Sequence, residues 1–217
     1  MNKLSRRPAA AICDFDGTIA DSMYIWTDAP RNLILHHGTV PPDNLLELIS
    51  PMTMNETMAW IRDNFIPDAD VDELTKELYC DITIMYARDV QPKTGAVDAL
   101  IRMKAEGMRI CILSATEEPL VRSAVKRFGI EDLFEFIACS DDWGGKTHAD
   151  CFLAAAKRLN VKPNDAIVFE DALHAARTAK SAGFLIGGVY DKSQDENWQE
   201  LKRISDWSGE SLGCFNL

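Results

Sequence analysis

The chain of 217 residues is 47% hydrophobic and 26% charged, which is ordinary for a soluble globular protein that can bury a core. Its formal net charge of −11 disfavours electrostatic binding to nucleic acid or to an anionic membrane. No apolar run approaches the roughly 20 residues that a helix needs to span a bilayer, and the basic N-terminal residues do not begin a signal peptide. We therefore expect a cytoplasmic protein that binds neither nucleic acid nor membranes.

The first stretch with the composition of a chemical site runs from Ala9 to Thr18. Its small and apolar residues predict a buried strand, which ends in two carboxylates, Asp14 and Asp16, followed by Gly17. Because side chains alternate along a strand, both carboxylates point to one side and can reach one reacting centre. Buried carboxylates are costly unless they are neutralised, and a divalent cation is the usual solution. A loop-capping acidic pair is the alternative.

Residues 22–89 carry helical patterns and no strand signal. Apolar residues recur there at helical spacing, and proline or glycine residues separate the segments. The expected helices are Met23–His37, Leu45–Ile49, a helix capped by Thr53 that extends to Phe65, and Val71–Asp89. We therefore expect residues 22–89 to form a small helical bundle inserted into another domain.

From residue 90 onward, expected helices alternate with short apolar runs. The runs that predict strands are Arg109–Leu113, Phe134–Cys139, Ala166–Phe169 and Phe184–Val189. The expected helices are Gly95–Glu106, Pro119–Phe128, Asp150–Leu159, Ala172–Ala182 and Trp198–Ile204. This alternation predicts an α/β fold with a parallel sheet and helices on both faces. Residues 1–21 and 90–217 would form this core domain, and residues 22–89 the insertion.

Polar side chains stand at the carboxyl ends of the predicted strands, where ligands of parallel sheets bind. Ser114 follows the second strand, Lys146 lies in the loop after the third, and Glu170 and Asp171 end the fourth. Together with the first acidic pair, this set suits phosphoryl transfer: the acids hold Mg²⁺, the lysine neutralises charge, and the hydroxyl holds phosphate oxygens. One carboxylate near the metal is a possible nucleophile.

These residues resemble the motifs of the haloacid dehalogenase superfamily, and the resemblance covers nearly all of residues 9–190. Asp14-Phe15-Asp16-Gly17-Thr18 resembles the first motif, Ser114 the second, Lys146 the third and Glu170-Asp171 the fourth. The resemblance implies a Rossmann-like core. The helical insertion is similar to the C1 cap of the β-phosphoglucomutase and phosphoglycolate phosphatase branch.

The resemblance implies a role for each acid. Asp14 would attack phosphorus and form an aspartyl-phosphate, while Asp16 would protonate the leaving alcohol and then deprotonate the attacking water. Mg²⁺ would be held by Asp14, by the backbone carbonyl of Asp16 and by Asp171. Glu170 would lie close by, either as a direct ligand or through water.

The same resemblance implies groups that bind the substrate. The Ser114 hydroxyl and the Ala115 N–H would hold phosphate oxygens, and Lys146 would offset charge on the nucleophile and on the phosphate. In the insertion, Trp26 and Asn55 are candidates for substrate contact.

We expect a Mg²⁺-dependent phosphatase that acts on a small phosphorylated metabolite, such as a sugar phosphate, a phosphoglycolate-like ester or a nucleotide monophosphate. A phosphosugar mutase is one alternative, but Glu117 and Glu118 follow the second motif where mutases carry a Lys-Asn pair, and would repel a second phosphate. A non-catalytic phospho-accepting or binding protein is another alternative. The expected oligomeric state is a monomer or a weak dimer.

Overall fold

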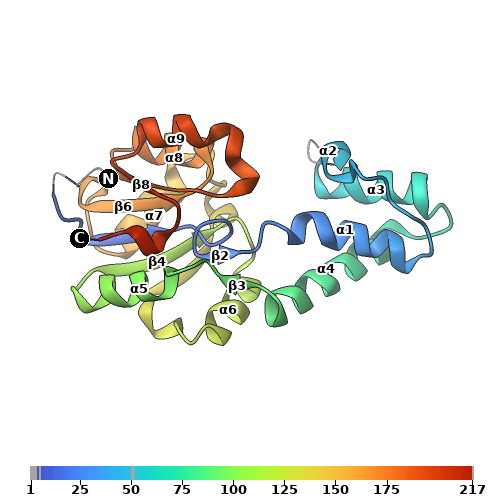
Figure 1. The fold of residues 1–217 in the computed structure, drawn as a ribbon, viewed down its shortest axis with the longest axis horizontal. Helices are drawn as coiled ribbons and strands as arrows, with labels where there is room; N and C mark the ends of the chain where they lie inside the picture. The colour runs from blue at the N-terminus through green and yellow to red at the C-terminus, as the bar shows by residue number, and fades with distance from the viewer. Residues whose placement is uncertain (1–3, 5, 50–51, 217) are drawn as a thin grey trace. The chain divides into compact units, whose positions relative to one another are not determined.

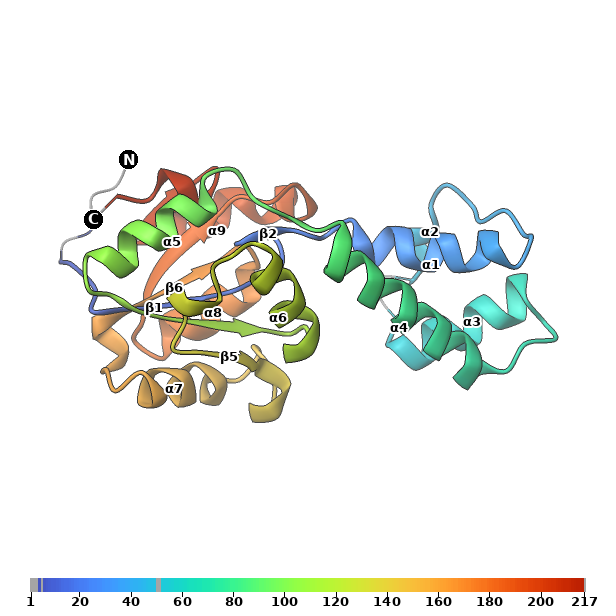
Figure 2. The same ribbon diagram turned by 90° about the horizontal axis from the view of Figure 1, so that it is seen from below.

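The computed structural model describes residue 4, residues 6–49 and residues 52–216. The chain divides into two compact units, one formed by Met1–Ser22 with Val90–Leu217 and the other by Met23–Asp89 (Figures 1 and 2). Among the described residues, no helix is both long and apolar enough to cross a membrane.

The first unit is built on a six-stranded sheet, within the described part of the chain, in the order β5-β4-β1-β6-β7-β8. Every neighbouring pair is parallel. The strands are β1 (Ala10–Cys13), β4 (Arg109–Ser114), β5 (Phe136–Cys139), β6 (Ala166–Glu170), β7 (Leu185–Val189) and β8 (Trp207–Gly209). All four residues of β1 are buried, because neighbouring strands flank it and helices cover both faces. The predicted α/β fold with a parallel sheet is confirmed.

Helices pack against both faces of this sheet. On one face, α7 (Ala149–Arg158), α8 (Leu173–Ser181) and α9 (Trp198–Ile204) share a core cluster with Ile12 of β1 and Val168 of β6. The helices α5 (Ala96–Ala105) and α6 (Glu118–Arg127) contact β4 and β5, and their residues lie outside that cluster. The adjacent strand residue Phe169 instead stacks edge-on against Phe215 and Trp207. This alternation of side chains gives the sheet two hydrophobic faces.

The second unit contains α1 (Ile25–His36), α2 (Leu45–Ile49), α3 (Met54–Phe65) and α4 (Val71–Arg88). The helix α4 packs along α1 and α3 through a buried stripe of period four, namely Leu74, Leu78, Ile82 and Tyr86. The helix α3 begins with a capping box, in which the Thr53 and Glu56 side chains each bond the other residue's backbone N–H. These helices lie within two residues of the predicted ranges.

Two short strands, β2 (Ala20–Asp21) and β3 (Gln91–Pro92), pair antiparallel where the chain leaves and re-enters the first unit. Neither β2, β3 nor β8 is predicted from the sequence. Strands of two or three residues carry no readable alternation, so they depend on the pairing that the tertiary fold supplies.

Candidate active site

The carboxyl end of β1 places Asp14 in the middle of the sheet. Its backbone N–H donates to the Phe169 carbonyl of β6 at 3.0 Å, and its side chain is almost fully buried. The Lys146 ammonium lies between this carboxylate and that of Glu170: it donates to Asp14 Oδ1 and, at 2.5 Å, to Glu170 Oε1. A buried lysine with two carboxylate partners stays charged, and these partners raise the pKa of Lys146 against the lowering effect of its burial.

Asp14, Glu170 and Asp171 form a buried acidic cluster, in which one carboxylate oxygen from each lies within 4.8 Å of the others. Burial raises the pKa of Asp14 to about 8, although Lys146 acts in the opposite direction. Burial and the neighbouring Asp14 likewise raise the pKa of Asp171 well above its usual range. The single positive charge of Lys146 does not balance three carboxylates. A divalent cation bound to this cluster would offset the remaining negative charge.

The oxygens of this cluster differ in what already holds them. Glu170 Oε1 accepts from Lys146, and Oε2 accepts from the Ala172 N–H at 3.1 Å. The Asp171 carboxylate accepts no hydrogen bond from any residue that the structure describes, although it is only 4% exposed. The donor set therefore fits a hard cation, with Asp14 and Asp171 more available as ligands than Glu170.

Three hydroxyl groups hold the Asp16 carboxylate. Ser22 Oγ donates to Oδ1 at 2.6 Å, while Thr116 Oγ1 and Ser114 Oγ donate to Oδ2 at 2.8 and 3.1 Å. The acidic cluster found among the described residues does not include the Asp16 side chain. Asp14 and Asp16, although only two residues apart, therefore have different surroundings, one next to a lysine and acids and the other next to hydroxyls.

The turn between Asp16 and Ala20 needs a glycine. Gly17 has a φ of +80°, and a Cβ atom there would lie 2.4 Å from Asp171 Oδ2. The Gly17 carbonyl accepts from Lys93 Nζ at 2.7 Å, and the same ammonium donates to the Tyr190 carbonyl and to Asp191. This contact fixes the turn against the loop that follows β7.

Two successive glycines position Lys146. Gly144 and Gly145 have φ values of +85° and +80°, and the Gly145 N–H donates to the Ser140 carbonyl at 3.0 Å. Side chains rarely adopt this left-handed conformation, so the pair of glycines permits the tight turn that follows β5. The structure thus brings Lys146 to Asp14 and Glu170 from a separate loop.

Residues 11–189 match the family of haloacid dehalogenase-like hydrolases. The chain belongs to this family. The resemblance of the sequence motifs to the haloacid dehalogenase superfamily is thereby confirmed.

Curated relatives resemble the chain over most of its length. It is 27% identical over 180 residues to validoxylamine A 7′-phosphate phosphatase of Streptomyces hygroscopicus, which covers 82% of this chain and 84% of that protein. It is 24% identical to the probable pseudouridine-5′-phosphatase of Drosophila melanogaster, over 98% of this chain and 96% of that protein. Among solved structures, a putative β-phosphoglucomutase from Thermotoga maritima aligns with a TM-score of 0.80 at 21% identity and covers 94% of each chain. At that identity the structural match shows the fold alone.

The structure also places the two candidates of the helical unit. Trp26, on α1, lines a cavity within that unit, whereas Asn55 is exposed in the first turn of α3 and does not line it. Ser50 and Pro51, which precede α3, lie outside the described residues.

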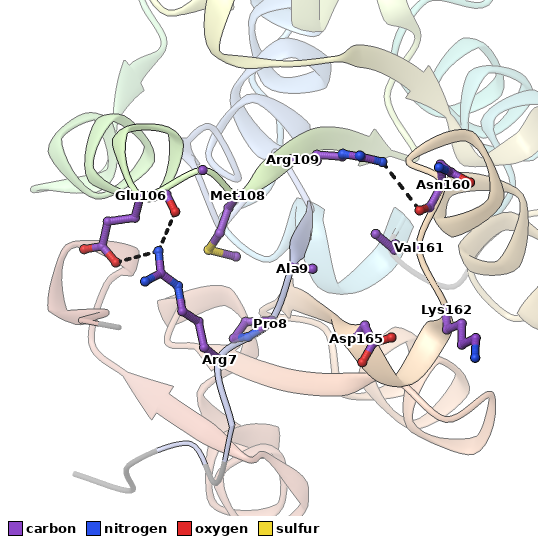
Figure 3. Close-up of a pocket in the computed structure, with 11 residues that line it drawn as sticks. Arg7, Pro8, Ala9, Glu106, Met108, Arg109, Asn160, Val161, Lys162 and Asp165 are labelled. Atoms are coloured by element: carbon purple, nitrogen blue, oxygen red, sulfur yellow. Dashed lines mark hydrogen bonds and ion pairs between the residues drawn. The ribbon is translucent and has the colours of Figure 1, made fainter.

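A cavity of about 670 Å³ lies at the opposite, amino-terminal edge of the sheet, next to the starts of β1, β4 and β6. Figure 3 shows two of its charged side chains, Arg7 and Arg109, bonded to neighbouring groups. Arg7 pairs with Glu106, and Arg109 donates to the Leu159 and Asn160 carbonyls. None of the predicted site residues lines this cavity.

Sequence reasoning missed Ser22, Thr116 and Lys93. Thr116 follows Ser114 by two residues, so the sequence could have indicated a second hydroxyl group in that loop. No sequence pattern marks Ser22 or Lys93, because each contacts the first motif only after the chain has folded.

Proposed function

We propose that this protein, a phosphoric monoester hydrolase of the haloacid dehalogenase-like family, cleaves a small phosphorylated metabolite by forming an aspartyl-phosphate on Asp14. The observation that carries the proposal is the position of Asp14, buried at the end of the central strand between Lys146 and two further acids. A carboxylate in such a place attacks phosphorus well only when nearby positive charge offsets the repulsion between anions.

The acidic cluster supports Mg²⁺ as the cofactor. Asp14 and Asp171, with the Asp16 carbonyl, would hold the ion, and Glu170 would remain bound to Lys146 and to the Ala172 N–H. When bound, the ion supplies positive charge to the nucleophile and to the phosphate oxygens.

The hydroxyl-bonded carboxylate of Asp16 suits proton transfer. The hydroxyls of Ser22, Ser114 and Thr116 hold this carboxylate in place, apart from the nucleophile Asp14. In the first step its protonated form would donate to the leaving alcohol, and in the second its carboxylate would accept a proton from the attacking water.

Ser114, the Ala115 N–H and Lys146 would bind the transferred phosphoryl group. Ser114 Oγ accepts from the Thr116 N–H at 3.0 Å while it donates to Asp16, so its position is fixed before a substrate arrives. The single hydroxyl hydrogen of Ser114 would turn from Asp16 to a phosphate oxygen when a substrate binds.

Residues 23–89 would act as the cap that selects the alcohol half of the ester. Two relatives are named as a validoxylamine A 7′-phosphate phosphatase and a probable pseudouridine-5′-phosphatase, which supports a small organic phosphate as the substrate here. A mutase reaction has no comparable support, because Glu117 and Glu118 lie directly after the phosphate-binding loop.

The test is phosphate release from a panel of phosphate esters with Mg²⁺, by the wild-type protein and by Asp14→Asn. We expect turnover of at least one class of ester, and a loss of about a thousandfold or more in the variant. The exposed Asp142→Asn variant is the matched control and should keep wild-type activity. Equal turnover by Asp14→Asn and wild type would overturn the assignment of the nucleophile.

A further inference from the structure

We propose that Lys93 is a positioning residue for the reaction. Its ammonium group holds the backbone turn that follows Asp16, and a free alkylammonium ion can take over this role when the side chain is removed. The effect of Lys93 on catalysis rests on the proposed function. Its effect on the turn rests on the contacts of the Lys93 side chain alone.

The Lys93 ammonium has three N–H groups, and each has an acceptor. It donates to the Gly17 carbonyl at 2.7 Å, to the Tyr190 carbonyl at 2.6 Å and to Asp191 Oδ2 at 2.8 Å. The side chain of Lys93 is only 12% exposed, and that of Asp191 is 9% exposed. Since all its donors are satisfied away from bulk water, this ammonium holds the Gly17 carbonyl against the loop that follows β7.

Asp191 gives this contact a fixed anchor. Its Oδ1 accepts from the Ser193 N–H at 2.9 Å and from Ser193 Oγ at 2.7 Å, while its Oδ2 accepts from Lys93. The negative charge of Asp191 balances the ammonium, so the pair adds no net charge next to Asp14. Lys146 differs in this respect, because its ammonium bonds two acids of the buried cluster. Lys93 therefore acts by fixing a position rather than by supplying charge.

The turn that Lys93 holds belongs to the candidate active site. Gly17 directly follows Asp16 and lies against Asp171, because a Cβ atom at Gly17 would stand 2.4 Å from Asp171 Oδ2. The backbone N–H of Lys93 also donates to the Ile19 carbonyl at 2.8 Å, so one residue holds the turn at two points. Because a displacement of about 1 Å in a catalytic group can cost about a hundredfold in rate, a shift of this turn should lower kcat.

A cavity of about 510 Å³ leads to this contact, and Lys93, Tyr190 and Asp191 line it together with the exposed Lys192. All its lining residues belong to the first unit. Replacing Lys93 by alanine removes the outer part of the side chain, which propylammonium matches in length and charge. This ion can enter through the cavity and donate to the same acceptors.

The kinetic test compares the wild type, Lys93→Ala and the matched control Lys192→Ala in phosphate release from 4-nitrophenyl phosphate. We expect the kcat of Lys93→Ala to fall about ten- to a hundredfold, and most of this loss to be recovered with propylammonium. Tetramethylammonium carries the same charge but has no N–H donor, so it should restore nothing. Lys192→Ala should keep the wild-type rate with and without either ion.

Amide hydrogen exchange, followed residue by residue by NMR, tests the position of the turn without any turnover. The Gly17 N–H donates to the Ala20 carbonyl at 2.9 Å, and the Ala20 N–H donates to the Phe15 carbonyl at 2.8 Å. In Lys93→Ala these two amides should exchange faster, by a larger factor than the amides of α7, which report the stability of the whole unit. Propylammonium should slow them again.

Lys93→Met provides a second variant. It keeps the apolar stem of the side chain and removes the donors, so it should show the same faster exchange without recovery, because the methionine occupies the space of the added ion. Thermal unfolding checks that both variants are folded.

The outcomes separate the positioning role from the proposed function. Wild-type exchange of the turn in both folded variants, or an equal rise throughout the unit that propylammonium does not reverse, would overturn the role of Lys93. Local exchange with an unchanged kcat would overturn its link to catalysis. Local exchange that propylammonium reverses, with no phosphate release by the wild type from any ester of the panel, would support the role in the turn and overturn the proposed function.

Discussion

Gly17 lies directly against the carboxylate of Asp171, since a Cβ atom at Gly17 would stand 2.4 Å from Asp171 Oδ2. The turn after the first motif and the acid after β6 therefore occupy adjoining space that no side chain can enter. This contact explains why a glycine follows the acidic pair: a side chain at position 17 would displace Asp171, whose carboxylate accepts no hydrogen bond from the part of the chain that the structure describes.

The Gly17→Ala variant should lose about a hundredfold or more in kcat/KM, because the new methyl group must displace Asp171 or the turn. Its affinity for Mg²⁺, measured by titration of activity, should fall as well. Gly107→Ala is the matched control, with a φ of +84° and nothing within 4 Å of the added atom. Gly107→Ala should lower the free energy of unfolding by about 1–2 kcal/mol through the same backbone strain, but it should keep its activity. Wild-type Mg²⁺ affinity in Gly17→Ala would contradict the role assigned to this contact.

Thr116 should act on the proton-transfer step through Asp16. Replacing it by the isosteric valine removes the 2.8 Å hydrogen bond to Asp16 Oδ2 and leaves the Thr116 backbone N–H bond to Ser114 in place. We expect kcat to fall about ten- to a hundredfold with little change in KM, since one charge-assisted hydrogen bond is worth about 1.5–3 kcal/mol. Substrates with very acidic leaving groups need less proton donation and should lose less. A uniform loss across leaving groups would show that Thr116 serves the fold rather than proton transfer.

Lys146→Met should destabilise the first unit. The substitution leaves Asp14, Glu170 and Asp171 buried together without their counter-charge, and loss of one partner of a buried pair costs about 3–5 kcal/mol. Thermal unfolding without metal measures the loss, which added Mg²⁺ should partly restore. The exposed Lys162→Met variant is the control and should unfold like the wild type. An unchanged unfolding temperature in Lys146→Met would contradict the ion-pair arrangement.

The buried pair of Lys93 and Asp191 should give the fold a pH dependence in the acid range. Burial alone would raise the pKa of Asp191, but hydrogen bonds from Lys93 and Ser193 outweigh it and hold that pKa below its ordinary value. A carboxyl group with a depressed folded pKa contributes stability above its unfolded pKa of about 3.9, and this contribution is lost as pH falls through the folded value. Denaturant unfolding of wild type and Asp191→Asn should therefore differ most near neutral pH and converge at the acid end. A constant difference at every pH would be inconsistent with this linkage.

The sequence predicts the elements that local pattern determines. The apolar run before Asp14, the helix-period stripe of α4 and the helix cap at Thr53 each form as expected, because their residues set local geometry directly. The strands β2, β3 and β8 were not predicted, because a segment of two or three residues forms a strand only when it pairs with another strand of the fold.

The candidate site shows the same division. The charged residues at the strand ends could be predicted to lie together, because the carboxyl ends of parallel strands meet at one edge of the sheet whatever the loops between them. The hydroxyls of Ser22 and Thr116 and the ammonium of Lys93 depend on which loops converge, and common residue types in loops do not reveal that.

The central claim is that Asp14 carries the phosphoryl group, and the Asp16→Asn variant tests it most directly. With 4-nitrophenyl phosphate the leaving group needs no proton, so the first step proceeds while the second lacks its base. We predict a burst of nitrophenol equal to one per active site, and one phosphoryl group on the peptide that contains Asp14 after acid quenching. Continued turnover without a burst, and with no phosphoryl group on that peptide, would contradict the account.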